Sequence, residues 1–267
     1  MAPAETRAPS KSSKPRERVN LGLVTRRIGS VVFWAFLTFS SILLFPVAVL
    51  LWALTVLFDK RLFLLHKFTC FWAALYTWAN PVWPVTIVDR DKIRRDETYV
   101  MVSNHLSLVD IFVVFRLFTH FKWVSKVENF RLPFIGWNMR LNRYIELRRG
   151  KRSSVMQMFR ACERTLEEGS SIMMFPEGTR SVNGKLRPFK PGAFELAIRC
   201  QRPLLVMTIE GSDNALPKRG FVLQGIHPIR MSVLGEIPVD ELGTDEGALS
   251  DRVRNQMAEH LGQSTRT

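Results

Sequence analysis

The chain has 267 residues, of which 46% are hydrophobic, which is enough for one domain with a sizeable core and an additional segment. The net charge of +14 favours an anionic partner: nucleic acid, an anionic membrane surface or a phosphorylated small molecule. The three cysteines, Cys70, Cys162 and Cys200, cannot all pair and lack the spacing of metal ligands. The composition therefore excludes a disulfide scaffold and a cysteine metal site, and it predicts reduced thiols in a cytoplasm-facing protein.

The first 58 residues divide into a basic segment and an apolar one. Residues 1–27 are rich in Pro, Ser, Lys and Arg and have no hydrophobic face, so we expect a disordered basic tail. Residues 28–58 carry no charge, and as one helix they would extend roughly 46 Å, against about 30 Å for a hydrocarbon core. Pro46 would kink or break that helix, and basic residues flank both ends. A re-entrant or hairpin membrane anchor with both ends on the cytoplasmic side is therefore favoured over a single crossing.

A second apolar segment, residues 62–83, contains His66 and Lys67 and ends at Pro81 and Pro84. We predict a helix that lies in the membrane interface and completes an anchor spanning residues 28–83. A second true membrane span is the alternative. The aromatic residues expected at headgroup depth are Phe68, Phe71, Trp72 and Trp78.

From residue 84 to residue 267 the pattern becomes that of an α/β domain. Helical periodicity predicts one helix over residues 155–166, ended by Gly169, and another over residues 249–261. Strands alternating with helices predict a mixed, mostly parallel sheet flanked by helices, with the helical membrane anchor N-terminal to it. The predicted strands are residues 85–88, 99–102, 122–125, 144–147, 171–175, 204–209 and 230–234.

One histidine and one aspartate lie five positions apart in the otherwise apolar stretch SNHLSLVDIF, residues 103–112. Residues five apart in a regular helix point about 140° away from each other. His105 and Asp110 therefore meet only if His105 lies in the turn before a helix and Asp110 in its first turn. A capping-box pattern at residues 107–110 supports that geometry.

The pair suits a general base, because imidazole titrates near neutrality and a carboxylate can fix its tautomer. A structural alternative stays open, in which Asp110 only bonds the backbone at a helix start and His105 is an ordinary loop histidine. No GxSxG nucleophile elbow is present, and Cys162 and Cys200 fall on helical segments. A base without a protein nucleophile suggests that a hydroxyl group of the substrate makes the attack.

A second motif, FPEGTRS at residues 175–181, follows the predicted strand 171–175. Pro176 ends the strand and Gly178 permits a tight turn. Glu177 and Arg180 then lie at the carboxyl end of a strand, where open α/β sheets bind ligands. An arginine there suits a phosphate. The alternative is a surface turn with a Glu–Arg pair.

Together the two motifs resemble those of the glycerolipid acyltransferase family, whose best-known members are the 1-acylglycerol-3-phosphate acyltransferases. That family carries an N-H-x4-D motif followed, at a separation similar to the one here, by F-P-E-G-T-R, and the likeness covers roughly residues 80–240. The resemblance implies that His105 is the catalytic base and that Asp110 orients it. It also implies substrate-binding roles for Glu177, Gly178, Thr179 and Arg180.

Two further blocks of the family are matched only in part. Residues 133–136 (PFIG) lead to residues 147–150 (LRRG), where Arg149 matches the family's arginine. Arg148 replaces the acidic residue that usually precedes it, and Val206 stands where a second proline is expected. The departure at Arg148 leaves the identity of the acceptor open.

The resemblance implies a membrane-bound O-acyltransferase. It would move a fatty acyl group from an acyl thioester, acyl-coenzyme A or acyl carrier protein, to the free hydroxyl of a lysophospholipid. The expected acceptor is 1-acylglycerol-3-phosphate, giving phosphatidic acid; the alternatives are another lysophospholipid or a lyso-aminolipid and, more distantly, a non-catalytic basic membrane scaffold. Arg149, Lys126 and Lys190 match basic positions of the family and would bind substrate, although the two lysines also suit a solvated surface.

No cofactor and no metal ion is implied. The expected partners are membrane lipids and the acyl donor, with the active site on the cytoplasmic face of a membrane. Nucleic acid is not expected, because the aromatic residues concentrate in the predicted anchor rather than along a basic stripe.

Overall fold

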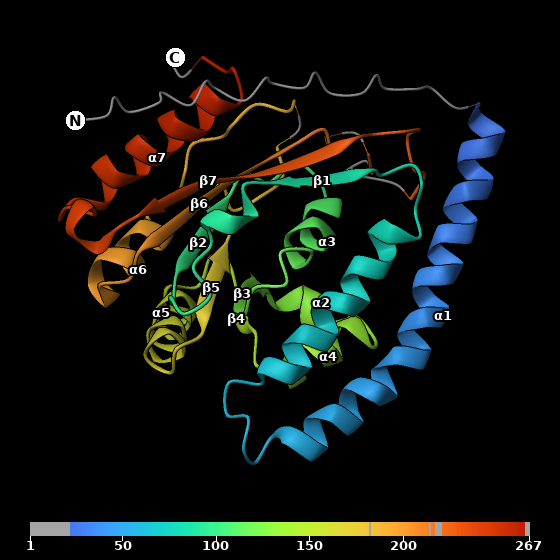
Figure 1. Ribbon diagram of the computed structural model, residues 1–267, viewed down its shortest axis with the longest axis horizontal. Coiled ribbons are helices and arrows are strands. Elements are labelled where there is room, and N and C mark those ends of the chain that lie inside the picture. The colour runs from blue at the N-terminus through green and yellow to red at the C-terminus, as the bar shows by residue number, and fades with distance from the viewer. Residues whose placement is uncertain (1–21, 182, 214, 217–220, 265–267) are drawn as a thin grey trace, which may run out of the picture.

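The computed structural model describes residues 22–181, 183–213, 215–216 and 221–264. Their strands form one sheet in the order β1-β7-β6-β2-β5-β3-β4, with helices on both sides (Figure 1). The strands are β1 (Val85–Val88), β2 (Val100–Ser103), β3 (Phe121–Lys126), β4 (Ile145–Leu147), β5 (Ser171–Met174), β6 (Leu204–Glu210) and β7 (Ile229–Ile237). The helices are α1 (Leu23–Thr55), α2 (Phe63–Trp78), α3 (Val109–Phe115), α4 (Ile135–Leu141), α5 (Arg152–Glu167), α6 (Gly192–Cys200) and α7 (Glu246–His260).

The sheet is mixed and mostly parallel, as predicted. Strands β2 to β6 all run in one direction, whereas β7 pairs antiparallel to β6 and parallel to β1. Each predicted strand is present, with its ends shifted by a few residues at most. The carboxyl ends of β6, β2 and β5, which are neighbours in the sheet, therefore meet at one edge.

Alternate strand residues supply two separate cores, one on each face of the sheet. On β2, Val100 and Val102 pack with buried residues of α5, α6 and α7, whereas Met101 packs with those of α2 and α3. A central strand that is apolar on both faces is typical of a parallel sheet covered by helices. The domain thus has three layers, and the helices α1 to α4 lie on the opposite side from α5, α6 and α7 (Figure 1).

α1 is a continuous helix of 33 residues, so the break predicted at Pro46 is absent. The residues next to Pro46 pack against the rest of the domain. The Phe45 ring lies 5.9 Å from the Phe134 ring, just before α4, and 5.5 Å from the Trp137 ring on α4, between ring centroids. Ala48 is fully buried. These contacts offset the hydrogen bond that a proline removes from a helix. The predicted break was therefore wrong, because tertiary packing outweighed a local preference, although α1 does bend along its length (Figure 1).

α1 is the one helix in the described ranges that is long and apolar enough to cross a membrane, by length and composition. It begins at Leu23, so the last residues of the predicted disordered tail belong to it. The rest of that prediction, residues 1–21, lies outside the described residues.

α2 packs into the domain on one side and is exposed on the other. Trp72 is only 4% exposed and His66 is 1% exposed, and Phe68 is half-buried. Trp72 therefore does not lie at headgroup depth as predicted, because the inner face of α2 joins the core on this side of the sheet. Phe71 and Trp78 are exposed. Since α2 shares a core with the strands, the fold has no break at residue 84.

Candidate active site

The candidate site lies where β2, β5 and β6 end side by side. β2 leads into His105, β5 into the turn at residues 175–178, and β6 into Ser212. The buried Asn104 fastens two of these ends together: its amide donates to the Ile209 carbonyl at 2.8 Å and accepts from the Ile209 N–H at 2.7 Å. Open α/β sheets bind ligands at such an edge.

The structure brings His105 and Asp110 together. The His105 Nδ1 atom lies 2.8 Å from Asp110 Oδ2. His105 precedes α3 and Asp110 is in its first turn, which is the arrangement the spacing required. Asp110 is fully buried, whereas the His105 side chain is 14% exposed. An ionised carboxylate only accepts hydrogen bonds, so Nδ1 donates and Nε2 is free to accept a proton.

Asp110 has three further donors. The backbone N–H groups of Leu106 and Ser107 donate to Oδ2 at 2.7 and 2.8 Å, and the Ser212 hydroxyl donates to Oδ1. The predicted capping box is half formed. The Asp110 carboxylate accepts from the Ser107 N–H, but the Ser107 hydroxyl donates to the Leu216 carbonyl at 3.3 Å and gives α3 no strong cap. A carboxylate with this many donors is held in one position, and it holds the imidazole in turn.

The His105 ring is also fixed from its flat side. It stacks on Phe175 with ring centroids 4.0 Å apart and planes within 5°. Phe175 in turn contacts Trp123 on β3, at 5.3 Å between centroids. The stack leaves the imidazole little freedom to rotate, so its Nε2 keeps one direction.

Glu177, which was expected to bind substrate, is buried and bonded to backbone groups. It is 3% exposed, and its carboxylate accepts from the N–H of His105 at 2.8 Å and the N–H of Arg187 at 3.2 Å. Burial raises the pKa of Glu177 to about 7, although the two backbone donors favour its charged form. The carboxylate thus ties the loop after β5 to the histidine.

The turn at Gly178 requires glycine. Its φ is +68°, and a Cβ there would lie 3.0 Å from the Lys190 side chain. Its N–H closes the turn on the Phe175 carbonyl at 2.9 Å, and its carbonyl accepts from Arg149. The turn therefore places its own backbone, one arginine and one lysine beside each other.

A cavity of about 530 Å³ opens in front of His105. Gly178 and Thr179 contribute to its wall, and none of the described residues that line it is acidic. Burial lowers the pKa of the Arg149 and Arg180 guanidinium groups, because it disfavours their charged forms. A bound anion would offset this effect. The cationic residues that line the cavity are Lys126, Arg149, Arg180 and Lys190.

Much of the remaining cavity wall is apolar, and a large part of it comes from the helices α1 to α4. α1 supplies Trp34 and Leu37, and α2 supplies Trp72 and Tyr76. A cavity with a cationic part and an apolar part suits an amphiphile that has an anionic head and a hydrocarbon chain. The other apolar lining residues include Leu108, Ile111, Phe112, Phe115, Leu132, Ile135 and Met139.

Comparison with known proteins indicates an acyltransferase domain. The family model described as Acyltransferase matches residues 84–210. A 1-acyl-sn-glycerol-3-phosphate acyltransferase from Chlamydomonas reinhardtii is 34% identical over 218 residues, which are 81% of this chain and 64% of the algal protein. These matches support the glycerolipid acyltransferase family that the two motifs indicate. It spans less than two thirds of the length of that algal relative.

Two further acyltransferases extend the likeness. A chloroplastic 1-acyl-sn-glycerol-3-phosphate acyltransferase from Brassica napus is 28% identical over 256 residues, covering 95% of this chain and 72% of the plant protein. The crystal structure of the 1-acyl-sn-glycerophosphate (LPA) acyltransferase PlsC from Thermotoga maritima has a TM-score of 0.73, covering 91% of this chain and 99% of that one. At 19% identity, that structure shows a shared acyltransferase fold.

Sequence reasoning about this candidate site missed several residues. Asn104 and Phe175 lie inside the two motifs. Their residue types alone did not indicate that Asn104 joins two strand ends or that Phe175 stacks on His105. Ser212 lies 102 positions from Asp110, and its only signal is that it follows a predicted strand. Arg148, the departure from the family pattern, is exposed and does not line the cavity.

Proposed function

We propose that this protein is a membrane-bound O-acyltransferase that moves a fatty acyl group from an acyl thioester to the free hydroxyl of a lysophospholipid. The favoured acceptor is 1-acylglycerol-3-phosphate, which gives phosphatidic acid. The donor is an acyl-coenzyme A or an acyl carrier protein. The observation that carries the proposal is the Asp110-held imidazole of His105, opening into a cavity that is cationic in one part and apolar in another.

His105 acts as the general base in this proposal. Its Nε2 accepts the proton of the acceptor hydroxyl while the hydroxyl oxygen attacks the thioester carbonyl carbon. The tetrahedral intermediate then collapses, the carbon–sulfur bond breaks, and the thiolate takes the proton back from the imidazolium. Asp110 stabilises the imidazolium through Nδ1. No protein nucleophile is needed, and the proton returns to the leaving group.

The cationic lining recognises the phosphate of the acceptor. Arg149 and Arg180 carry planar guanidinium groups that can each donate two parallel hydrogen bonds to phosphate oxygens. Lys126 and Lys190 add positive charge to the same cavity. The absence of acidic groups from the described lining leaves nothing there to repel a phosphate. The apolar part of the cavity then receives an acyl chain.

The arrangement of α1 supports an anchor on one side of a membrane rather than a crossing. Near its start, Arg26 donates to Gln224 at 2.8 Å and Trp34 donates to the Phe221 carbonyl at 2.7 Å. Just beyond its end, the Arg61 carbonyl accepts from Lys122 at 2.7 Å. Both ends are therefore attached to the same domain, which favours both lying on the cytoplasmic side.

The outer face of α1 is suited to lipid. Its large apolar side chains are exposed over the whole length of the helix, and burying apolar surface of this kind stabilises membrane association. We propose that this face enters the bilayer and that lipid reaches the cavity sideways, while the acyl donor arrives from water. The exposed residues are Leu23, Val24, Ile28, Val31, Val32, Phe36, Phe39, Ile42, Leu43, Val47, Val49, Leu50 and Leu54.

The test uses purified protein in vesicles, a labelled acyl thioester and a panel of acceptors. We expect 1-acylglycerol-3-phosphate to be acylated fastest, and His105→Ala to lower turnover at least about a hundredfold, as loss of a general base does. His260→Ala, at an exposed histidine at the end of α7, is the matched control and should keep full activity.

Three results would contradict parts of the proposal. Wild-type activity in His105→Ala would refute the assignment of the base. Faster acylation of a neutral lysophospholipid or a lyso-aminolipid would replace the acceptor but keep the reaction. A wild-type protein that binds vesicles and transfers no acyl group to any acceptor would favour a non-catalytic scaffold.

A further inference from the structure

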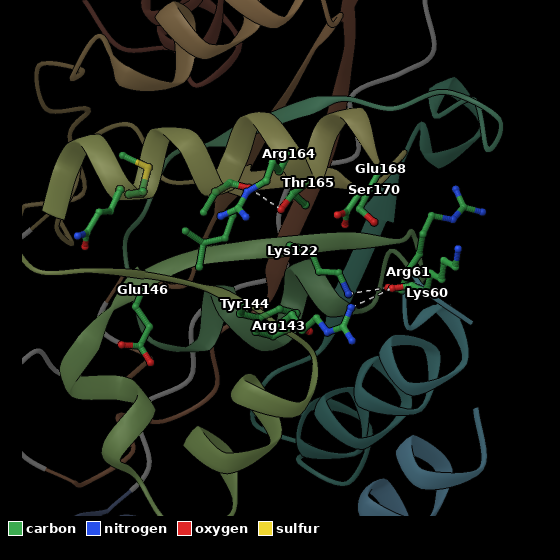
Figure 2. A pocket seen from close by; sticks show the side chains of 14 residues that line it. Lys60, Arg61, Lys122, Arg143, Tyr144, Glu146, Arg164, Thr165, Glu168 and Ser170 are labelled. Carbon is green, nitrogen blue, oxygen red and sulfur yellow. Dashed lines mark hydrogen bonds between the residues drawn. The ribbon is translucent and has the colours of Figure 1, made fainter. Parts of the chain in front are cut away.

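A second cavity, of about 400 Å³, lies at the other end of the sheet from His105. It is bounded by α5, by the amino ends of β3, β4 and β5, and by the connection between α1 and α2 (Figure 2). Because these strands are parallel to β2, their amino ends are remote from the edge that carries the candidate active site. The cationic residues that line it are Lys60, Arg61, Lys122, Arg143 and Arg164.

Positive charge dominates this cavity. Its acidic lining residues in the described ranges are Glu146 and Glu168. Glu146 is already engaged, since Arg140 lies 2.7 Å from it in an ion pair. The cavity is thus lined by five cations from four segments of the chain. Glu168, its other carboxylate, is exposed and makes no ion pair within the described ranges. Cations gathered from separate segments in this way favour an anionic ligand.

Lys122 is the buried member of this group. It is 4% exposed, and its ammonium donates to the Arg61 carbonyl at 2.7 Å. Within the described part of the chain no carboxylate lies within ion-pair distance of it. Figure 2 shows Lys122 and Arg143 pointing together toward the backbone of the α1–α2 connection. An ammonium has three donors, so two are left for a ligand.

The electrostatic surroundings of Lys122 favour a bound anion. Burial lowers the pKa of Lys122 to about 7, and Arg143 adds to the effect, while Asp59 and Glu168 oppose it. A buried amine without a paired anion is costly to keep charged. An anion in the cavity would offset that cost.

The surroundings of the cavity indicate where the anion comes from. Lys60 and Arg61 are flanked along the chain by exposed apolar side chains: Leu57 is 89% exposed and Phe58 70%, and Phe63 and Leu64 follow. Exposed apolar residues on both sides of basic ones are typical of a segment at a membrane surface, where each basic residue near anionic headgroups contributes about 1 kcal/mol. A lipid phosphate is then the anion within reach.

We propose that this cavity binds the phosphate group of an anionic membrane lipid, at a site separate from the acceptor site. The bound phosphate bridges the α1–α2 connection to β3 and α5, and so holds the membrane-facing helices against the sheet. The site goes beyond the proposed transfer reaction, and its test measures no turnover.

The experiment compares binding of the full chain to phosphatidylcholine vesicles with and without phosphatidylglycerol. The pocket variant is Lys60→Gln with Arg164→Gln, two exposed residues that line the cavity. The control variant, Lys151→Gln with Arg160→Gln, removes the same charge from exposed positions on or next to α5 that line neither cavity. We expect the pocket variant to lose about thirtyfold in affinity for the anionic vesicles and the control variant about threefold or less.

Each other outcome overturns the site. Equal losses in the two variants would mean that diffuse surface charge, and not this cavity, attracts the lipid. Binding of inorganic phosphate or glycerol 3-phosphate that depends on the pocket residues, with unchanged vesicle affinity, would replace the lipid by a soluble ligand. A wild-type chain that binds neither kind of vesicle would contradict the proposed membrane association as well.

Discussion

Buried charges have many hydrogen-bond partners at one end of the sheet and few at the other. At the carboxyl ends of β2, β5 and β6, the buried charges are carboxylates with many donors: Asp110 accepts four hydrogen bonds and Glu177 accepts two. At the amino ends, the buried charge is the cation Lys122, whose bond in the described structure goes to one carbonyl. A satisfied buried charge fixes its neighbours, whereas an unsatisfied one favours a ligand.

The difference separates catalysis from binding. The hydrogen bonds at the carboxyl end fix an imidazole and an aspartate before any substrate arrives, which is what a chemical step requires. At the amino end, Arg61, Lys122 and Arg143 donate only to neutral backbone carbonyls in the described structure, and an anion would complete them. Substitutions can break each arrangement independently, since they lie at opposite ends of the sheet.

The largest effect is expected for Asp110→Asn, at the end where the charges are satisfied. The amide keeps the shape but removes the negative charge, so the imidazolium loses its stabilising partner and the Nδ1–H tautomer its fixed acceptor. We expect kcat to fall about 10²- to 10⁴-fold. Circular dichroism should show an unchanged fold, and Asp251→Asn, at an exposed position on α7, should retain full activity. Activity near the wild-type value in Asp110→Asn would show that His105 does not need the carboxylate of Asp110.

The next largest effect is expected for Arg180→Gln, which removes a cation from the active-site cavity. A charge-assisted hydrogen bond contributes about 1.5–3 kcal/mol, so KM for the lysophospholipid should rise about 10- to 150-fold with a smaller change in kcat. Arg148→Gln is the matched control, because Arg148 is exposed and outside the cavity. Equal effects of the two variants on KM would show that overall charge, and not the position of Arg180, attracts the acceptor.

Ser212→Ala sharpens the same comparison with a smaller change. It removes one of the four donors to Asp110 and leaves the other three in place. We expect kcat to fall about tenfold, within the range for one hydrogen bond to a charged group, and the acidic limb of the pH–rate profile to shift. Ser153→Ala, at an exposed position on α5, is the control. An unchanged profile in Ser212→Ala would show that the backbone donors suffice.

Much of the fold could be predicted from local pattern, because most strands are short runs rich in apolar residues. The two motifs also indicated His105, Asp110 and the turn at Gly178, since these positions follow from spacing and from the carboxyl end of a strand. Two predictions failed where packing between distant segments decided the outcome. Pro46 stays within α1 because Phe45 packs against α4, and Trp72 is buried because α2 covers the sheet.

The rest of the site could not be predicted because it depends on strand order. Ser212 reaches Asp110 only because β6 lies next to β2, and sequence gives no such adjacency. Glu177 was expected to bind substrate, and the two bonds of its carboxylate to backbone N–H groups could not be foreseen from the sequence. The second cavity was missed for the same reason: its cations come from segments that only the folded sheet brings together.

The last effect is expected at the amino end, in the dependence of stability on pH. The folded-state pKa of Lys122, about 7, lies below the ordinary value of 10.5, so between these limits the unfolded chain binds more protons than the native one. The free energy of unfolding should therefore rise with pH across this window, by at most about 1.4 kcal/mol per pH unit from this group. Lys122→Met should remove that slope, and Lys151→Met, at an exposed lysine, should keep it. Denaturation midpoints measured in neutral detergent, as differences from the wild type at each pH, isolate this residue from other groups that titrate there.

Adding phosphatidylglycerol should flatten the wild-type slope, because a bound phosphate favours the charged ammonium. A slope that the lipid leaves unchanged would place the anion elsewhere than beside Lys122.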